Sequence, residues 1–552
     1  MAAWTKLGLL TGLGGAMSVW AAHKTRRSFG CYADTAFEHH PNIRDLSSSP
    51  AYHLVNNFWL PQDHQQPFWN TGPATAFPLH FINQLQNQPV HLEDDDAHED
   101  SFDHGDNFGL LSTGSAVVGS TLFHHGYGRK ISIKEAVPKA RRMLKKHMQE
   151  IGAPGLVVGV SIDGHVVWTE GLGYSDFENS LPCQANTVMR IASISKAISM
   201  TIVAKLWEQG LLDLDKPIQE YVPEFPMKTF EGHPVTITCR QLVSHLSGIR
   251  HYSKTKKTDE EYLVDPPQNI DKKSRDEKKP TVLAKYNEFD EKEYYLKESF
   301  PKVSDALKVF QDDPVLVEPG TEFLYTTYGF TLLSAVIESV TKRKFTENMK
   351  DLLRDFDMTN TFLDEHEPII HNRSRNYRRD KLGRLKNAPY VDNSYKWAGG
   401  GLVSTVGDLL KFAHLLLYAA QVRNPSDKPG YLKAETLERM WTLVDHTKKN
   451  KFVENGYGMG WMVVPERFVG GWCLQQPHVV YHTGGAIGAS SVLTLLPREK
   501  NVMSWDEYPN VQDGKKPPQG IVVTLIVNLE QASLYKKSVE IAQLFDRVDI
   551  HH

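Results

Sequence analysis

The segment from residue 193 to residue 206 most constrains how this chain can fold. It reads SISKAISMTIVAKL, and its helical projection is apolar on nearly every side. A helix without a polar face has to lie inside a protein core. The chain has 552 residues, which is long enough to bury a core of that kind. We therefore expect a buried helix that begins at Ser193 and stops near Gly210.

The same segment carries a Ser-x-x-Lys motif at Ser193 and Lys196. A helix start favours a developing negative charge, and the lysine lies one turn later on the same face. Burial lowers the pKa of a lysine, and a neutral amine can take the serine proton. The structural alternative is a serine that caps the helix and a lysine that reaches solvent. The same spacing recurs, outside any comparably apolar segment, at Ser253/Lys256, Ser299/Lys302, Ser339/Lys342 and Ser533/Lys536.

Composition excludes several classes of protein. A net charge of -4 argues against a nucleic-acid-binding surface over the whole chain. A mean hydropathy of -0.40 excludes a multi-span membrane protein. The four cysteines have no metal-ligand spacing, so we expect unpaired thiols, no metal site and no cofactor. The chain has no G-x-S-x-G, P-loop or H-E-x-x-H motif, which argues against the usual α/β-hydrolases, P-loop enzymes and zinc proteases.

The first 130 residues do not resemble a folded domain. Residues 1–30 are basic and free of acids around an apolar stretch, which suits a mitochondrial presequence. A secretory signal or a single weak membrane anchor is the alternative. Residues 31–130 are rich in polar residues and include an acidic run with interleaved histidines, so we expect a poorly ordered segment. A weak metal site there is the less favoured interpretation.

Regular patterning runs from about residue 131 to residue 549. An amphipathic helix is expected over 133–151, although Pro138 favours a start a few residues later. Asp163-Gly164 joins two apolar runs, which predicts a β-hairpin. The remaining expected elements are a mostly helical middle, strands at 491–496 and 521–529, and a last helix at 532–548.

Strands at both ends of this region predict one sheet that is built from the chain termini and covered by helices, an α/β (α+β) fold. Two polar insertions interrupt the pattern. Residues 254–302 are dense in charge and should form a solvated loop or a partly helical arm, and residues 504–519 form a polar extension between two strands.

Two further motifs could take part in chemistry. Tyr325-Thr326-Thr327 offers a tyrosine hydroxyl that can relay a proton near a lysine. His482-Thr483-Gly484-Gly485 precedes a strand, and its glycines allow a substrate and a backbone N–H donor to approach. Taken alone, each is more simply explained as a core aromatic residue or a glycine turn.

In this order, Ser-x-x-Lys, Tyr-x-Thr and His-Thr-Gly resemble the motifs of the serine beta-lactamase and penicillin-binding-protein superfamily, in its class C-like branch. The stretches LVSHLSGI at 242–249, GGGLVSTVGDL at 399–409 and GYGMGW at 456–461 resemble it too. The resemblance implies a beta-lactamase/DD-peptidase fold: a mainly antiparallel sheet from both chain ends, flanked by helices, and a mostly helical subdomain.

The resemblance also implies roles for the motif residues. Ser193 would be the nucleophile, Lys196 its activator and Tyr325 the proton exchanger, with the N–H groups of Ser193 and Gly485 as oxyanion hole. The substrate would meet Thr327, His482, Thr483 and Gly484. The chain departs from the family at Thr327, where Asn is usual, and at His482, where Lys is common. A histidine is only partly charged near neutrality, which favours peptides or esters over carboxylate-bearing antibiotics.

The expected function is therefore a serine hydrolase that forms an acyl-enzyme, a peptidase in the mitochondrial intermembrane space. The resemblance implies a role in lipid metabolism or organelle organisation. The alternative is a structural protein that self-assembles into oligomers or filaments and performs little catalysis. The expected partners are a peptide or ester substrate, other copies of the chain, and a membrane through the N-terminal segment, but no nucleic acid.

Overall fold

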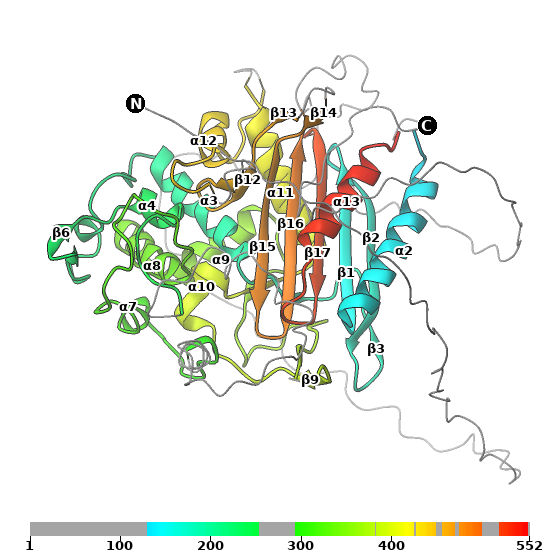
Figure 1. Ribbon diagram of the computed structural model, residues 1–552, viewed down its shortest axis with the longest axis horizontal. Coiled ribbons are helices and arrows are strands. Elements are labelled where there is room, and N and C mark those ends of the chain that lie inside the picture. Colours follow the sequence, from blue (N-terminus) through cyan, green and yellow to red (C-terminus); the bar gives the residue numbers. More distant parts are fainter. Residues whose placement is uncertain are drawn as a thin grey trace, which may run out of the picture. The chain divides into compact units, whose positions relative to one another are not determined.

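Strands from the two ends of the patterned region lie side by side in one sheet. A computed structural model describes residues 130–252, 293–380, 382–423, 427–448, 455–469, 474–498 and 518–549. Its largest sheet has eight strands in the order β11-β12-β15-β16-β17-β1-β2-β3. β1 (Gly155–Ile162) pairs antiparallel with β17 (Gly520–Val527) along its whole length, as the neighbouring cyan and red arrows of Figure 1 show. The predicted sheet from both chain ends is confirmed.

The remaining strands of this sheet are also antiparallel to their neighbours. They are β2 (His165–Asp176), β3 (Leu181–Pro182), β11 (Gly456–Tyr457), β12 (Met462–Val464), β15 (Val479–Ala486) and β16 (Ala489–Pro497). β1 and β2 are joined at Asp163-Gly164, where both residues have positive φ, as a two-residue hairpin turn requires. The hairpin prediction is confirmed, and β2 runs seven residues past the expected end at Thr169.

Helices cover both faces of the sheet, which explains why β1, β16 and β17 are buried almost throughout. α2 (Ile133–Ile151) and α13 (Tyr535–Phe545) lie on one face, and α11 (Val406–Gln421) packs against β1 and β17 (Figure 1). α2 begins five residues before Pro138, because Ser132 and Glu135 form a capping box that stabilises the earlier start.

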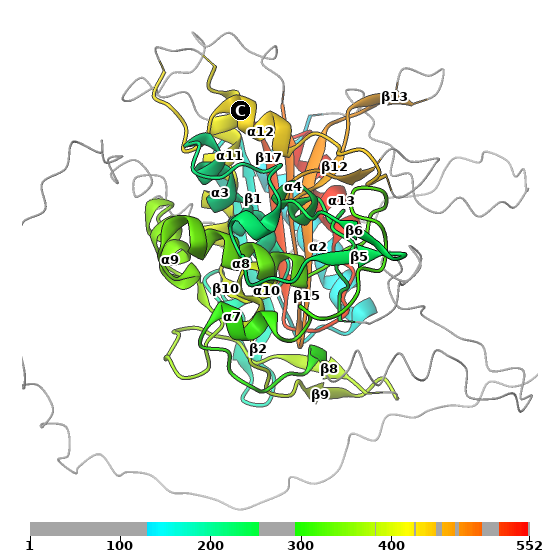
Figure 2. The same ribbon diagram turned by 90° about the vertical axis from the view of Figure 1, so that its left-hand side faces the viewer.

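A largely helical part lies beside the β15 side of the sheet (Figures 1 and 2). Its central helix is α3 (Ile194–Glu208), in which 12 of the 15 residues are buried. The predicted buried helix is thus confirmed. It ends at Glu208, and Gln209 caps it before Gly210, which has a left-handed conformation. The other helices here are α4 (Cys239–Val243), α7 (Val303–Leu307), α8 (Tyr328–Thr341), α9 (Phe345–Asp355), α10 (Trp397–Gly400) and α12 (Ala434–Met440).

Short elements complete the described chain. They are β4 (Met189–Arg190), β5 (Lys228–Phe230), β6 (His233–Val235), β7 (Phe362–Leu363), β8 (Tyr377–Arg379), β9 (Leu385–Asn387), β10 (Leu402–Ser404), β13 (Arg467–Val469), β14 (Leu474–Gln476), and the 3-10 turns η1 (Ile218–Glu220) and η2 (Ser394–Lys396). β4, β10 and β7 form a small sheet next to the start of α3. In the described ranges, no helix is long and apolar enough to cross a membrane.

The expected segments 1–30 and 31–130 lie outside the described residues, except for Lys130, as does most of the insertion 254–302. The last part of this insertion, residues 293–302, differs from the solvated arm that we expected. Tyr294 and Phe300 are half-buried and pack against the main core, and Glu293 pairs with the buried Arg250 at 2.6 Å. We expected a solvated arm because this stretch has many charged residues, and the sequence pattern did not indicate these core contacts. Within 504–519, only residues 518 and 519 are described.

Candidate active site

Ser193 lies directly before the first turn of α3, and its side chain makes no capping hydrogen bond. The capping alternative for this serine is therefore not what the structure shows. Ala192, the preceding residue, has φ 48, a left-handed conformation that is unusual for alanine. Such strain persists only where the surroundings enforce it, and it is common at functional sites. The hydroxyl is thus held at a helix start and is available for other contacts.

Lys196 is fully buried, so the alternative of a solvent-exposed lysine is wrong. Its Nζ lies 3.0 Å from Oγ of Ser193 and 3.3 Å from Oγ1 of Thr327, and donates to the carbonyl oxygen of Gly399. Burial, and next the nearby charge of Lys396, hold the pKa of Lys196 well below its usual value. A neutral amine can donate to Gly399 and Thr327 and still accept the Ser193 proton.

Tyr325 completes the group that the structure brings together. It comes three residues before α8, and the Ser193 side chain lies close enough to its hydroxyl to oppose the rise that burial causes in its pKa. The centroid of its ring lies 4.9 Å from Nζ of Lys196. Burial raises the pKa of Tyr325, so the phenol keeps its proton near neutrality and can donate it.

The end of β15 lies against the residues before Ser193. A Cβ at Gly484 would come within 2.3 Å of the carbonyl oxygen of Ile191, so only glycine permits this approach. The hydroxyl of Ser491 on β16 donates to the same carbonyl oxygen at 2.8 Å. β12 pairs with β15 only as far as Tyr481, and no other strand of the described residues pairs with the next part of that edge.

Thr483 and Gly485 are the exposed residues of this edge. A Cβ built at Gly485 would have no atom within 4 Å, so the backbone there faces open space. This arrangement leaves room for a substrate next to the start of α3. The oxyanion role of the Ser193 and Gly485 N–H groups remains a prediction.

His482, which the resemblance places at the substrate, is buried. Its imidazole is 2% exposed, with Nδ1 2.7 Å from the carbonyl oxygen of Thr483 and Nε2 2.8 Å from the hydroxyl of Tyr457. A carbonyl oxygen only accepts, so Nδ1 carries the proton and Nε2 of a neutral ring accepts from Tyr457. Both ring nitrogens are thus engaged within the protein. Thr327, 3% exposed, likewise contacts Lys196 from inside.

Sequence reasoning assigned no role to several residues that support the site. His245 stacks on Tyr325 with ring centroids 4.3 Å apart, and its Nδ1 accepts from the backbone N–H of Thr326 at 3.2 Å. Tyr457 contacts His482, as described above, and Gly399 contacts Lys196. These residues lie in the stretches 242–249, 399–409 and 456–461, which resemble the superfamily. That resemblance was the sequence signal that could have indicated their roles.

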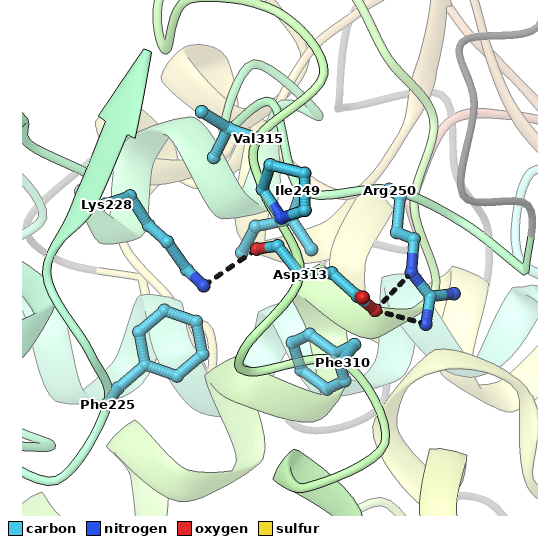
Figure 3. A pocket seen from close by; sticks show the side chains of 8 residues that line it. Phe225, Lys228, Ile249, Arg250, Phe310, Asp313 and Val315 are labelled. Carbon is cyan, nitrogen blue, oxygen red and sulfur yellow. Dashed lines mark hydrogen bonds and ion pairs between the residues drawn. The ribbon is translucent and has the colours of Figure 1, made fainter. Parts of the chain in front are cut away.

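A separate small cavity lies away from this group (Figure 3). Arg250 binds Asp313 through an ion pair of 2.6 Å, and Lys228 donates to the backbone carbonyl oxygen of Asp313. The space between these side chains is too small for the centre of a water molecule, so the cluster is a packed ionic contact rather than a ligand site. In the described part of the chain, no group of three His, Cys, Asp or Glu side chains could hold a metal.

Comparison with known proteins agrees with this geometry. The family model Beta-lactamase matches residues 140–542. Serine beta-lactamase-like protein LACTB, mitochondrial, from Mus musculus is 44% identical over 475 residues, which cover 79% of this chain and 84% of that protein. The solved structure of the octameric penicillin-binding protein homologue from Pyrococcus abyssi has a TM-score of 0.51 at 23% identity and covers 74% of this chain and 76% of its own.

A second solved structure, EstCE1, a hydrolase with promiscuous acyltransferase activity, has a TM-score of 0.53 at 18% identity, over 75% of this chain and 99% of its own. Both structures support the fold. The predicted superfamily is confirmed, since the family model matches well over half of the chain and the mouse LACTB protein is similar over most of its length. The chain belongs to the beta-lactamase family.

Proposed function

We propose that this chain is a serine hydrolase that forms an acyl-enzyme on Ser193. Family membership supports a serine hydrolase-like protein. The observation that carries the proposal further is the 3.0 Å contact between Oγ of Ser193 and Nζ of Lys196, a buried amine with a lowered pKa. A hydroxyl beside a neutral amine is an activated nucleophile.

Acylation would begin with attack of the Ser193 oxygen on the substrate's acyl carbon. The Oγ–C bond forms, and the hydroxyl proton passes to Lys196. The N–H groups of Ser193 and Gly485 would donate to the oxyanion, and the start of α3 adds a favourable dipole. When the tetrahedral intermediate collapses, the C–N or C–O bond breaks. Tyr325 gives its proton to the leaving amine or alcohol and is reprotonated from Lys196.

Deacylation would repeat these steps with water as the nucleophile. The water oxygen bonds to the acyl carbon, its proton passes through Tyr325 or Lys196, and the bond to Oγ breaks with return of a proton to Ser193. The products are a carboxylic acid and the original enzyme. In this proposed cycle every proton moves among Ser193, Lys196, Tyr325, the leaving group and water.

We propose peptides, and next esters, as substrates. A penicillin carries a carboxylate, and many relatives would meet it with a permanently charged lysine. Here His482 occupies that position and is engaged by Tyr457 and Thr483. A peptide bond inside a longer chain has no carboxylate next to it and does not need such a cation. A penicillin hydrolysed as fast as the best peptide would reverse this choice of substrate.

The test of the reaction is intact-protein mass spectrometry after treatment with a fluorophosphonate. The expected result is one adduct on the wild type and none on Ser193→Ala. Ser339→Ala, which removes the serine of another Ser-x-x-Lys pair, is the matched control and should label like the wild type. Equal labelling of Ser193→Ala and the wild type would overturn the proposal.

We also propose a mitochondrial location, in the intermembrane space. The mouse relative is named mitochondrial, and the acid-free basic start of this chain supports the same address. A fusion of residues 1–60 to a fluorescent protein should enter mitochondria. Entry into the secretory pathway would contradict this. A part in lipid metabolism or organelle organisation stays an expectation from the resemblance.

The self-assembling structural protein remains the alternative function. Octameric assembly is stated of the Pyrococcus abyssi protein, whose similarity carries the fold alone. Sedimentation velocity of the wild type and Ser193→Ala distinguishes the two functions. A hydrolase should react with the fluorophosphonate whether it sediments as a monomer or as a large species. A purely structural protein should sediment as a large species and should not react with the fluorophosphonate.

A further inference from the structure

A second buried lysine lies close to the proposed catalytic group. Lys396 ends η2 and is 5% exposed. Its Nζ lies 4.9 Å from the ring centroid of Tyr395, 5.1 Å from that of Tyr294 and 5.5 Å from that of Tyr252. Within the described ranges, no carboxylate lies within 4.0 Å of this nitrogen. The ammonium is thus stabilised by three aromatic faces instead of by a counter-ion.

The same turn of chain also holds Lys196. α10 follows Lys396 at once, and the carbonyl oxygen of Gly399, three residues after Lys396, accepts from Nζ of Lys196. The carbonyl oxygen of Ala398 accepts from the hydroxyl of Ser199 at 3.1 Å, one turn further along α3. These contacts keep the backbone next to Lys396 directly against the helix that carries Lys196.

A tyrosine connects the two lysines on the other side. Burial raises the pKa of Tyr252, and the side chains of Tyr395 and Thr327 oppose this rise from close by. Thr327 in turn lies 3.3 Å from Nζ of Lys196. Tyr252 thus faces Lys396 with its ring and lies next to a residue that contacts Lys196. The two amines are both buried and share these neighbours.

Charge repulsion follows from this arrangement. Burial, and next the Arg190 guanidinium, lower the pKa of Lys396 to about 7, while the Asp364 carboxylate opposes that shift. The charge of Lys396 in turn lowers the pKa of Lys196. Two ammonium groups in a low-dielectric site repel each other. As the pH falls, one of the two lysine positions is therefore protonated while the other stays neutral.

The surroundings favour Lys396 as that position. It has three tyrosine rings around it and the field of Asp364, whereas Lys196 is fully buried. The other titratable groups near this network are His251, stacked on Tyr252 at 4.0 Å, and Glu293, which pairs with Arg250. Neither of them forms an ion pair with either amine.

We propose that Lys396 is a positioning residue of this hydrolase: it takes the proton that the two buried lysines compete for and keeps the Lys196 amine neutral, ready to accept the Ser193 proton. This inference rests on the proposed function. A neighbouring cation is a known way to hold a catalytic lysine in its neutral form. Without Lys396, Lys196 would take the proton itself and lose its capacity as a base as the pH falls.

The test is the rate of Ser193 phosphonylation by a fluorophosphonate, followed from mildly acidic to alkaline pH. The acid limb of this profile is the pH range in which the rate falls as the pH decreases. In Lys396→Met this limb should move to higher pH, by about one unit, because no neighbouring charge then lowers the pKa of Lys196. At alkaline pH the rate should approach that of the wild type. Lys396→Arg keeps the charge, so its acid limb should stay at the wild-type position or move to lower pH.

A merely structural role would lower the rate equally at every pH and leave the limb in place. Superimposable limbs for the wild type and Lys396→Met would therefore overturn the inference. If Lys396→Met does not fold, as judged by near-UV circular dichroism, Tyr294→Leu removes one face of the enclosure. It should give a smaller shift in the same direction, and an unshifted limb in that variant counts against the inference. A wild type that never labels at Ser193 refutes the proposed function instead.

Discussion

The hydroxyl oxygen of Tyr457 lies 2.8 Å from Nε2 of His482. Both residues are buried, and Nδ1 of the same imidazole is engaged by the backbone of Thr483. The position where many relatives place a lysine is therefore part of the protein's own hydrogen-bond network. This relationship decides how substrate binding should depend on pH.

We expect KM for a blocked peptide to change little between mildly acidic and mildly basic pH, because His482 offers the substrate no titrating contact. A peptide with a free carboxylate at that end should show the same flat profile. The measurement is KM against pH for both peptides with the wild type and His482→Lys. Tighter binding of the carboxylate peptide by the wild type as the pH falls would show that His482 reaches the substrate after all.

Ser193→Ala and Lys196→Ala should each lower kcat/KM by several orders of magnitude, because the proposed nucleophile and its proposed base would act as one unit. The double variant should be scarcely worse than either single variant. Steady-state kinetics on one ester substrate compares all three with the wild type. A double variant in which the two losses multiply would show that Lys196 acts independently of Ser193.

Gly484→Ala should destabilise the protein by about 1–3 kcal/mol, because its new Cβ would meet the carbonyl oxygen of Ile191 at 2.3 Å. The displaced chain carries Ser193, so labelling by the fluorophosphonate should slow as well. The measurement is urea denaturation together with the labelling rate. Gly485→Ala is the matched control for stability, since a Cβ there meets nothing within 4 Å. Equal stability of the two variants would contradict the close approach at Gly484.

Lys196→Met should remove activity but stabilise the fold, most of all at low and neutral pH. The folded chain lowers the pKa of Lys196, so above that pKa the unfolded chain binds more protons, and the cost of burying the amine decreases as pH rises toward 10.5. The gain in the free energy of unfolding should shrink by at most about 1.4 kcal/mol per pH unit. Urea titrations at neutral and alkaline pH measure this gain. A constant gain, or one that grows with pH, would be inconsistent with a buried neutral lysine.

The sequence predicted the parts of the fold that depend on local pattern. The all-apolar segment after Ser193 could only be a core helix, and the Asp163-Gly164 pair specified a tight hairpin. The start of α2 was harder, because Pro138 argued for a later start and the capping box at Ser132 outweighed it. The core contacts of Tyr294 and Phe300 were concealed by the charged residues around them.

The candidate site was predictable in its members but not in its contacts. Spacing placed Lys196 near Ser193, yet the acceptor on Gly399 lies 203 residues further along the chain and follows from tertiary packing. The orientation of His482 depends on which face of β15 it occupies and on Tyr457, and no motif spacing reveals either. Lys396 carries no motif at all, and only its burial among three tyrosines distinguishes it from a surface lysine.

The position of β17 in the sheet has a consequence for when this protein can act. This strand comes from the last part of the described chain, yet it lies between β16 and β1 near the middle of the sheet. A ribosome or a translocation pore therefore releases Ser193, Lys196 and Tyr325 long before the strand that joins the two halves of the sheet arrives. A chain still in transit holds all three groups but has no completed edge of β15 to oppose them. Synthesis from one end to the other would thus delay the proposed hydrolysis until β17 has been delivered.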